Sequence, residues 1–146
     1  MNKFIFLLSL FFLTLLFLGR VSMANEEKNL INMTLKDGIV VIKTYPDIAP
    51  KHVAQIKQLV EQGLYNGVVF HRVIEGFMAQ TGDVEFGNST NDNYNLNRAG
   101  TGGSKLPDIQ AEFSKENHKR GTLSMARAQD PNSANSQFFI CFDAAP

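Results

Sequence analysis

Cysteine is nearly absent from this sequence, and its scarcity excludes several kinds of site. Cys141 is the only one among 146 residues, so no disulfide can form within the chain. It stands in an apolar run, which favours a place in the core over a role as a nucleophile. His52, His71 and His118 lack metal-ligand spacing and no HExxH occurs, so the sequence predicts no metal site. His52 and His118 have polar neighbours and are predicted to be solvated.

An excess of charge of either sign is also missing. The chain has 14 basic and 14 acidic residues, and residues 25–146 keep 12 and 14 of them. Because no basic face is evident, we expect no nucleic-acid partner. No Gly-x-Ser-x-Gly element favours a serine hydrolase. Gly-Thr-Gly-Gly-Ser-Lys over residues 100–105 has the wrong order and the wrong context for a phosphate-binding loop.

Long hydrophobic runs are confined to the N-terminal end. Lys3 precedes an apolar run over residues 4–18, and Ser22 and Ala24 offer small residues at the positions that a signal peptidase reads. The run is shorter than the ~20 apolar residues of a membrane span. Residues 1–24 therefore predict a cleaved signal peptide and a periplasmic protein with no stable membrane anchor. The alternative is an uncleaved anchor.

Residues 25–146 are predicted to form one domain of short strands with one helix. Asp-Gly at residues 37–38 separates two strands, 29–34 and 39–44, and indicates a hairpin. A helix is predicted from Pro50, with apolar residues along one face, to a C-cap at Gly63. Further strands are predicted at 68–74, 77–81, 109–113, 122–127 and 137–142. This pattern indicates a mostly-β fold, either a sandwich or a barrel.

Residues 83–107 form a long polar segment rich in glycine and asparagine, which predicts a functional or surface loop. The stretch before it, residues 70–82, places Arg72 in a short strand near Phe and Met. An unpaired charge in apolar surroundings is costly. A concave site where the guanidinium meets apolar side chains would explain this composition. The alternative is a structural ion pair of Arg72 with Glu75 or Asp83.

Two blocks of sequence carry a family signature. The first is Phe70-His71-Arg72-Val73-Ile74 followed by Gly76-Phe77-Met78, Gln80 and Gly82-Asp83. The second is Gly121-Thr122-Leu123-Ser124-Met125-Ala126-Arg127 followed by Asn135-Ser136-Gln137-Phe138-Phe139-Ile140. Together they resemble the cyclophilins, the peptidyl-prolyl cis-trans isomerases, from about Met33 to Pro146. The resemblance implies an antiparallel eight-stranded barrel capped by two helices.

The sequence departs from the family pattern at four places. Glu75 stands where many members have proline, and Arg127 where many have asparagine. The loop over residues 130–135 is one residue longer than the common eukaryotic form. The family continues well past Pro146, so the resemblance implies a barrel that is incomplete at its C-terminus. We expect residues 25–146 by themselves to be loosely folded and nearly inactive, because the open barrel would leave apolar strands without partners.

The resemblance implies catalysis of rotation about X-Pro peptide bonds, which needs no nucleophile, metal or cofactor. Arg72 matches the catalytic arginine that contacts the prolyl amide, and Gln80 matches the side chain that orients it. The positions that match substrate-binding residues are Phe77, Met78 and Phe139 as pocket walls, Ala126 and Arg127 as the backbone that pairs with the peptide, and Gln137 in the groove. For Phe77 and Phe139 the alternative is an ordinary core position, which suits Phe138 or Phe142 better.

The predicted partners are proline-containing segments of unfolded or folding exported proteins, and the protein is expected to be a monomer. One alternative is a binding module that holds proline-containing segments without isomerising them. Another is an inactive fragment of an isomerase.

Overall fold

The structure is a computed structural model that describes residues 28–144. The predicted signal peptide lies outside the described residues. The chain divides at Thr44 into two compact units, and the second begins at Tyr45. The single domain over residues 25–146 stays a prediction.

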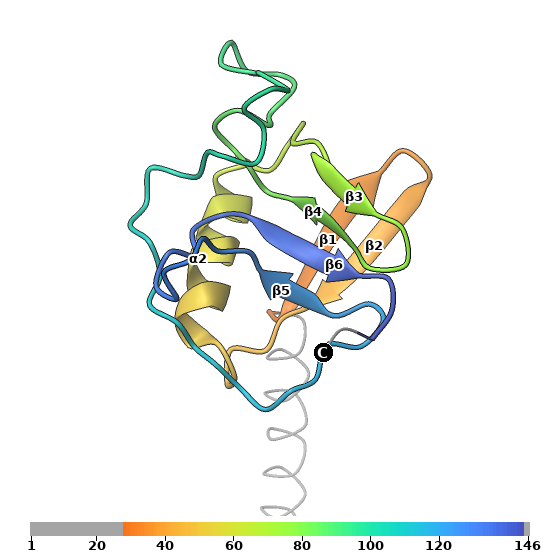
Figure 1. Ribbon diagram of the computed structural model, residues 1–146, viewed down its shortest axis with the longest axis vertical. Coiled ribbons are helices and arrows are strands. Elements are labelled where there is room, and N and C mark those ends of the chain that lie inside the picture. Colours follow the sequence, from red (N-terminus) through yellow and green to blue (C-terminus); the bar gives the residue numbers. More distant parts are fainter. Residues whose placement is uncertain (1–27, 145–146) are drawn as a thin grey trace, which may run out of the picture. The chain divides into compact units, whose positions relative to one another are not determined.

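The first unit is a β-hairpin. β1 (Leu30–Leu35) and β2 (Gly38–Lys43) pair antiparallel, joined by a two-residue turn (Figure 1). β-Branched side chains fit the pleated backbone, and Asp-Gly is typical of such tight turns. The predicted hairpin is confirmed, with each strand shifted by one residue.

The second unit begins with the helix α2 (Pro50–Glu61). Proline is favourable here because the N–H that it lacks would have no partner inside the helix. Gly63 follows the helix with a φ of 70°, and its N–H donates to the carbonyl of Val60. Leu59 is completely buried. The predicted helix and its glycine cap are confirmed.

His52 was predicted to be solvated, and this prediction is wrong. The side chain is buried, and its Nδ1 lies 2.7 Å from Oε2 of Glu112. Glu112 also accepts the backbone N–H groups of Lys51 and His52, so it caps the start of α2. Burial by itself would raise the pKa of Glu112, but these hydrogen bonds hold it below its ordinary value. The partner lies 60 residues away, so the neighbours of His52 in sequence could not indicate its burial.

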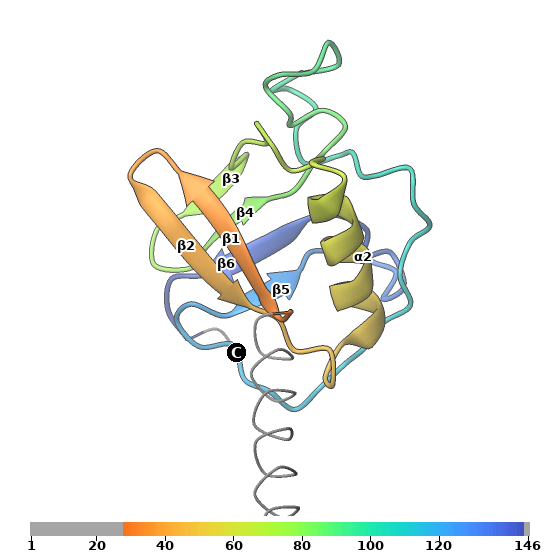
Figure 2. The ribbon, with the colours of Figure 1, turned by 180° about the vertical axis from the view of Figure 1, so that it is seen from behind.

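A four-stranded antiparallel sheet forms the rest of the regular structure in the second unit. Its strands are β3 (Arg72–Ile74), β4 (Met78–Thr81), β5 (Leu123–Met125) and β6 (Phe138–Cys141), in the order β3-β4-β6-β5. Figures 1 and 2 show α2 beside the ends of β5 and β6. Just after α2, Tyr65 meets Phe138 edge to face, with ring centroids 5.7 Å apart. Burial raises the pKa of Tyr65, whose hydroxyl donates to the carbonyl of Ser136.

Several predicted strands are shorter in the structure, and one is missing. The strand predicted over 68–74 begins at Arg72, because Val68 makes only an isolated bridge with Asn88. In the segment 109–113 only Ile109 pairs, with Ala134. Val68 and Ile109 pair with residues in loops rather than in strands, so no continuous ladder of backbone hydrogen bonds forms beside them.

Strands are the main regular element, so the mostly-β class is confirmed. Residues 28–144 form six strands in two sheets and one helix. The closed eight-stranded barrel with capping helices that the resemblance implies is not seen among them. Cys141 is 1% exposed and lies in β6, which confirms its predicted place in the core.

Candidate active site

Four side chains form a row across one face of the four-stranded sheet. The register places Arg72 opposite Gln80, Gln80 opposite Phe139, and Phe139 opposite Ser124. Directly opposite residues of an antiparallel pair project from the same face, with Cβ atoms about 4.5–5.5 Å apart. Strand pairing therefore brings together both predicted catalytic residues and one predicted pocket wall.

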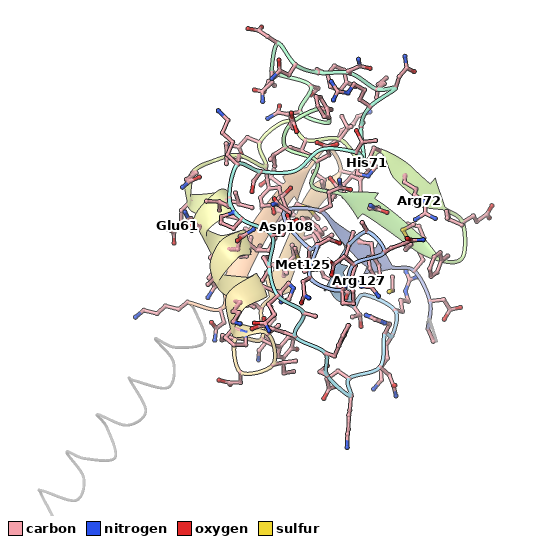
Figure 3. The ribbon with its side chains drawn as sticks, turned by 60° about the vertical axis from the view of Figure 1, so that its left-hand side comes forward. Glu61, His71, Arg72, Asp108, Met125 and Arg127 are labelled. Atoms are coloured by element: carbon pink, nitrogen blue, oxygen red, sulfur yellow. The ribbon has the colours of Figure 1, made fainter. Side chains whose placement is uncertain are left out.

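Hydrogen bonds run along this row and beyond it. Nη1 of Arg72 donates to Oε1 of Gln80 over 3.3 Å, and Nε2 of Gln80 donates to Oε1 of Gln137 over 2.9 Å. Nε2 of Gln137 then donates to the carbonyls of Gly100 and Gly102 over 3.0 and 2.7 Å. Arg72 is exposed at the β3 end of the sheet (Figure 3). We call this series of hydrogen bonds the amide relay.

The three predicted pocket walls differ in how deeply they are buried. Phe77, immediately before β4, is 42% exposed, whereas Met78 is only 2% exposed. Phe139 is half-buried, and its ring centroid lies 5.8 Å from that of His118. Phe138, on the opposite face of β6, is 7% exposed and belongs to the core as predicted. Of the three predicted pocket walls, Phe77 and Phe139 are therefore accessible, and Met78 is buried.

This arrangement can bind and orient an amide. A guanidinium is always charged and offers rigidly placed donors. Gln80 holds one nitrogen of Arg72, and the exposed side chain has further N–H groups to donate. The nearby aromatic rings provide contact surface for an apolar ring.

Comparison with known proteins decides the family. The model of the family described as cyclophilin type peptidyl-prolyl cis-trans isomerase/CLD matches residues 30–146. The chain belongs to the cyclophilin family. It is 62% identical over 123 residues to the probable peptidyl-prolyl cis-trans isomerase of Brucella abortus (strain 2308), covering 84% of this chain and 62% of that protein. It is 41% identical over 103 residues to peptidyl-prolyl cis-trans isomerase B of Escherichia coli (strain K12), covering 70% and 56%.

Solved cyclophilin structures have the same fold. A Cryptosporidium parvum cyclophilin type isomerase, determined in the presence of the dipeptide Ala-Pro, matches with a TM-score of 0.67 and 27% identity. That match covers 80% of this chain and 70% of the other. A cyclophilin from Hirschia baltica matches with a TM-score of 0.65 and 29% identity, over 80% and 58%. This cyclophilin chain spans 62% of the length of its Brucella relatives.

The structural alternative for Arg72 is not supported. Within residues 28–144 no ion pair joins Arg72 to Glu75 or Asp83. Asp83 is instead fully buried, and its carboxylate accepts only backbone N–H groups. Arg72 of this cyclophilin is therefore held by an amide and stays available to a ligand.

His71 precedes β3 and is half-buried, and both of its ring nitrogens are buried without a hydrogen-bond partner. Its imidazole lies against Gly100, where an added Cβ would come within 2.9 Å of Cδ2. Burial lowers the pKa of His71, and the charge of Arg72 acts in the same direction against the opposing effect of Asp83. A neutral imidazole next to Arg72 avoids a second positive charge at the site.

Ala126 and Arg127, the predicted peptide-pairing residues, differ in how their backbone groups are used. The N–H of Ala126 donates to the carbonyl of Gln137, in register with the β5–β6 ladder. Backbone groups alternate in direction along an extended strand, so those of Arg127 point away from β6. No hydrogen bond within the described part of the chain uses the N–H or C=O of Arg127, and its guanidinium turns to the carbonyls of Ala128 and Gln129.

The long loop takes part in the site, which its composition only partly indicated. Figures 1 and 2 show it leaving the sheet and returning beside α2, where Gln55 donates to the carbonyl of Pro107. The loop approaches Asp83 closely at Gly102, where an added Cβ would lie 2.7 Å from Oδ1 of Asp83. The role of Asp83 as the acceptor for this loop was missed, although Gly82-Asp83 belongs to the family signature.

Metal-binding groups and membrane spans are both missing from residues 28–144. This range holds no group of three or more His, Cys, Asp or Glu side chains that could bind a metal ion. No helix within it has the length and apolar character needed to cross a membrane.

Proposed function

We propose that this cyclophilin accelerates rotation about X-Pro peptide bonds, with Arg72 as the catalytic donor. The observation that carries this proposal is the exposed guanidinium of Arg72, hydrogen-bonded to Gln80 on the sheet face that also carries Phe139. Membership of the cyclophilin family and the similarity to bacterial peptidyl-prolyl cis-trans isomerases support it.

The chemistry follows from the peptide bond. Rotation is opposed by a barrier of about 18–20 kcal/mol because the C–N bond has partial double-bond character. As the bond twists, the proline nitrogen regains a lone pair and becomes a better hydrogen-bond acceptor. An N–H of Arg72 aimed at that nitrogen stabilises the twisted amide more than either planar form, and this difference is what accelerates the reaction.

The other site residues bind and orient the substrate. Phe77 and Phe139 contact the proline ring, and the buried Met78 completes the pocket. Gln80 orients Arg72 and holds a carbonyl of the substrate. The free backbone groups of Arg127 pair with the peptide, and Gln137 lines the groove. All of these residues come from one chain, so a monomer supplies the whole set.

The substrates that fit this site are proline-containing segments of unfolded or folding proteins. The Cryptosporidium parvum cyclophilin, whose structure was determined in the presence of Ala-Pro, supports this class. A module that binds such segments without isomerising them is the competing function. Arg72 is exposed and has no ion-pair partner within residues 28–144, which favours the enzyme. Binding a proline ring requires only the aromatic surface, whereas isomerisation also requires a donor aimed at the amide.

A prolyl-isomerisation assay on a short Ala-Pro peptide tests the function. We expect the protein, purified at its natural length as a monomer by light scattering, to accelerate an exchange that takes tens of seconds or more without catalyst. The rate should saturate with peptide concentration. Peptide binding in a parallel titration without any acceleration would establish the binding module instead.

Export is the second part of the proposal: we infer that residues 1–24 are a signal peptide and that the protein assists the folding of exported proteins in the periplasm. Support comes from Lys3, the apolar run and the small residues before Asn25. Intact-mass measurement of the protein from its native cells should give a polypeptide that begins at Asn25 in the soluble periplasmic fraction. A mass that retains residues 1–24 in a membrane pellet would contradict cleavage and release.

A further inference from the structure

Asp83 is a buried carboxylate that joins two distant parts of the long loop. Its Oδ1 accepts the N–H groups of Glu85 and Phe86 over 3.1 and 2.9 Å. Its Oδ2 accepts those of Gly100 and Gly102 over 2.7 and 2.9 Å. Burial by itself would raise the pKa of Asp83, but the four N–H donors outweigh it and hold that pKa below its ordinary value. Asp83 is therefore an anion that fixes the turn over residues 100–102.

The turn is seated directly on this carboxylate. Gly100 has a φ of 99°, a conformation that side chains rarely adopt. A Cβ at Gly102 would lie 2.7 Å from both Oδ1 of Asp83 and the ring of Phe86. Neither position has room for a side chain. The N–H groups of both glycines are held by Asp83, and these hydrogen bonds fix the turn and therefore the orientation of its two carbonyls.

Those carbonyls determine which way the Gln137 amide faces. Both accept from Nε2 of Gln137, which leaves Oε1 to accept from Gln80. One N–H of the Gln80 amide is thereby used, and its Oε1 is the atom that faces Arg72. An amide has donors at one end and an acceptor at the other, so reversing Gln137 would place NH₂ against NH₂ and reverse Gln80 in turn. Arg72 would then face a donor.

We propose that Asp83 is a positioning residue for Arg72, acting through the turn over residues 100–102 and the amide relay. The carboxylate orients two carbonyls, and these carbonyls orient the amide of Gln137. That amide in turn orients Gln80, whose Oε1 holds the guanidinium. This inference rests on the proposed isomerase function. Asp83 itself touches neither Arg72 nor the peptide, so its contribution appears only in how often Arg72 is correctly oriented.

Asp83→Asn tests the proposal, because it keeps the shape of the side chain but replaces one acceptor oxygen with a donor. In the natural-length protein we expect kcat to fall roughly tenfold while KM changes less than about twofold, since the aromatic surface remains. The same substitution made together with Arg72→Ala should lower kcat by less than about twofold beyond Arg72→Ala alone. This loss of additivity distinguishes positioning of Arg72 from general damage to the loop.

Glu112→Gln is the matched control. Glu112 is the other nearly buried carboxylate that accepts backbone N–H groups, but it caps α2 and lies outside the amide relay. Its substitution should lower stability and leave kcat per folded molecule unchanged. Gln137→Leu, which removes the relay without altering Asp83, should reproduce the loss of kcat and serves if Asp83→Asn does not fold.

The outcomes separate this inference from the proposed function. If Arg72→Ala leaves kcat unchanged, the proposed function itself fails. If Arg72→Ala lowers kcat but Asp83→Asn does not, only the positioning role is overturned. Equal fractional losses from Asp83→Asn with and without Arg72 also overturn it, because they show damage that does not pass through the guanidinium.

Discussion

Replacing Arg72 with alanine is expected to lower kcat/KM for an Ala-Pro peptide more than tenfold, a loss above about 1.4 kcal/mol of transition-state stabilisation. Arg72 is the charged donor on the sheet face that carries Gln80 and Phe139. The twisted amide gains most from this donor, because its nitrogen becomes an acceptor only during rotation. A protease-coupled or NMR exchange assay on the natural-length protein measures the effect.

Peptide affinity provides the internal check on this variant. Phe77 and Phe139 remain in Arg72→Ala, so the Kd for a non-isomerising proline peptide should rise much less than kcat/KM falls. Arg120→Ala is a matched control: the Arg120 guanidinium donates to the carbonyl of Phe142 and belongs to neither the row nor the amide relay. It should leave kcat/KM nearly unchanged. Equal losses of affinity and rate in Arg72→Ala would show that Arg72 only binds.

Gly82→Ala is expected to destabilise the protein strongly, although it adds only one methyl group. Gly82 has a φ of 93°, and a Cβ there would lie 2.5 Å from the carbonyl oxygen of Ser136 and 2.9 Å from Cα of Gln137. Both are backbone atoms just before β6, so they cannot move aside as a flexible side chain would. Strained φ costs about 1–3 kcal/mol, and overpacking costs about 1–3 kcal/mol more. The thermal midpoint should fall by roughly 10 °C or more.

Gly76→Ala is the control for backbone strain alone. Gly76 has a φ of 70°, but an added Cβ meets no atom within 4 Å. This variant should lose only about 1 kcal/mol, since L-residues pay about 1–2 kcal/mol in this conformation. Thermal unfolding of both variants by circular dichroism makes the comparison. Equal thermal midpoints of the two variants would show that the close approach of Gly82 to the backbone of residues 136–137 adds no destabilisation.

The sequence predicted those features whose causes lie close together in the chain. Asp-Gly between β-branched runs was enough for the hairpin, and Pro50 and Gly63 marked both ends of α2. Both depend on backbone preferences of a few consecutive residues. The family signature identified Arg72 and Gln80, and the structure places them directly opposite each other.

Predictions failed where a residue's environment is supplied by a distant segment. His52 has polar neighbours in sequence but is buried against Glu112. The extended segment 109–113 meets a loop, so it forms one bridge instead of a strand. Burial and hydrogen-bond partners depend on long-range contacts, which composition and periodicity do not encode locally.

By itself the sequence determined the hairpin, the helix, the mostly-β class and, through two motifs, the family, and it indicated Arg72 as the candidate catalytic donor. Only the tertiary structure decided that Asp83 holds the turn over residues 100–102 and that this turn orients Gln137, 35 to 37 residues away. The physical reason is that an amide or a carboxylate takes its orientation from the groups that face it. Those groups come together only when the register of β3, β4 and β6 has brought their strands side by side.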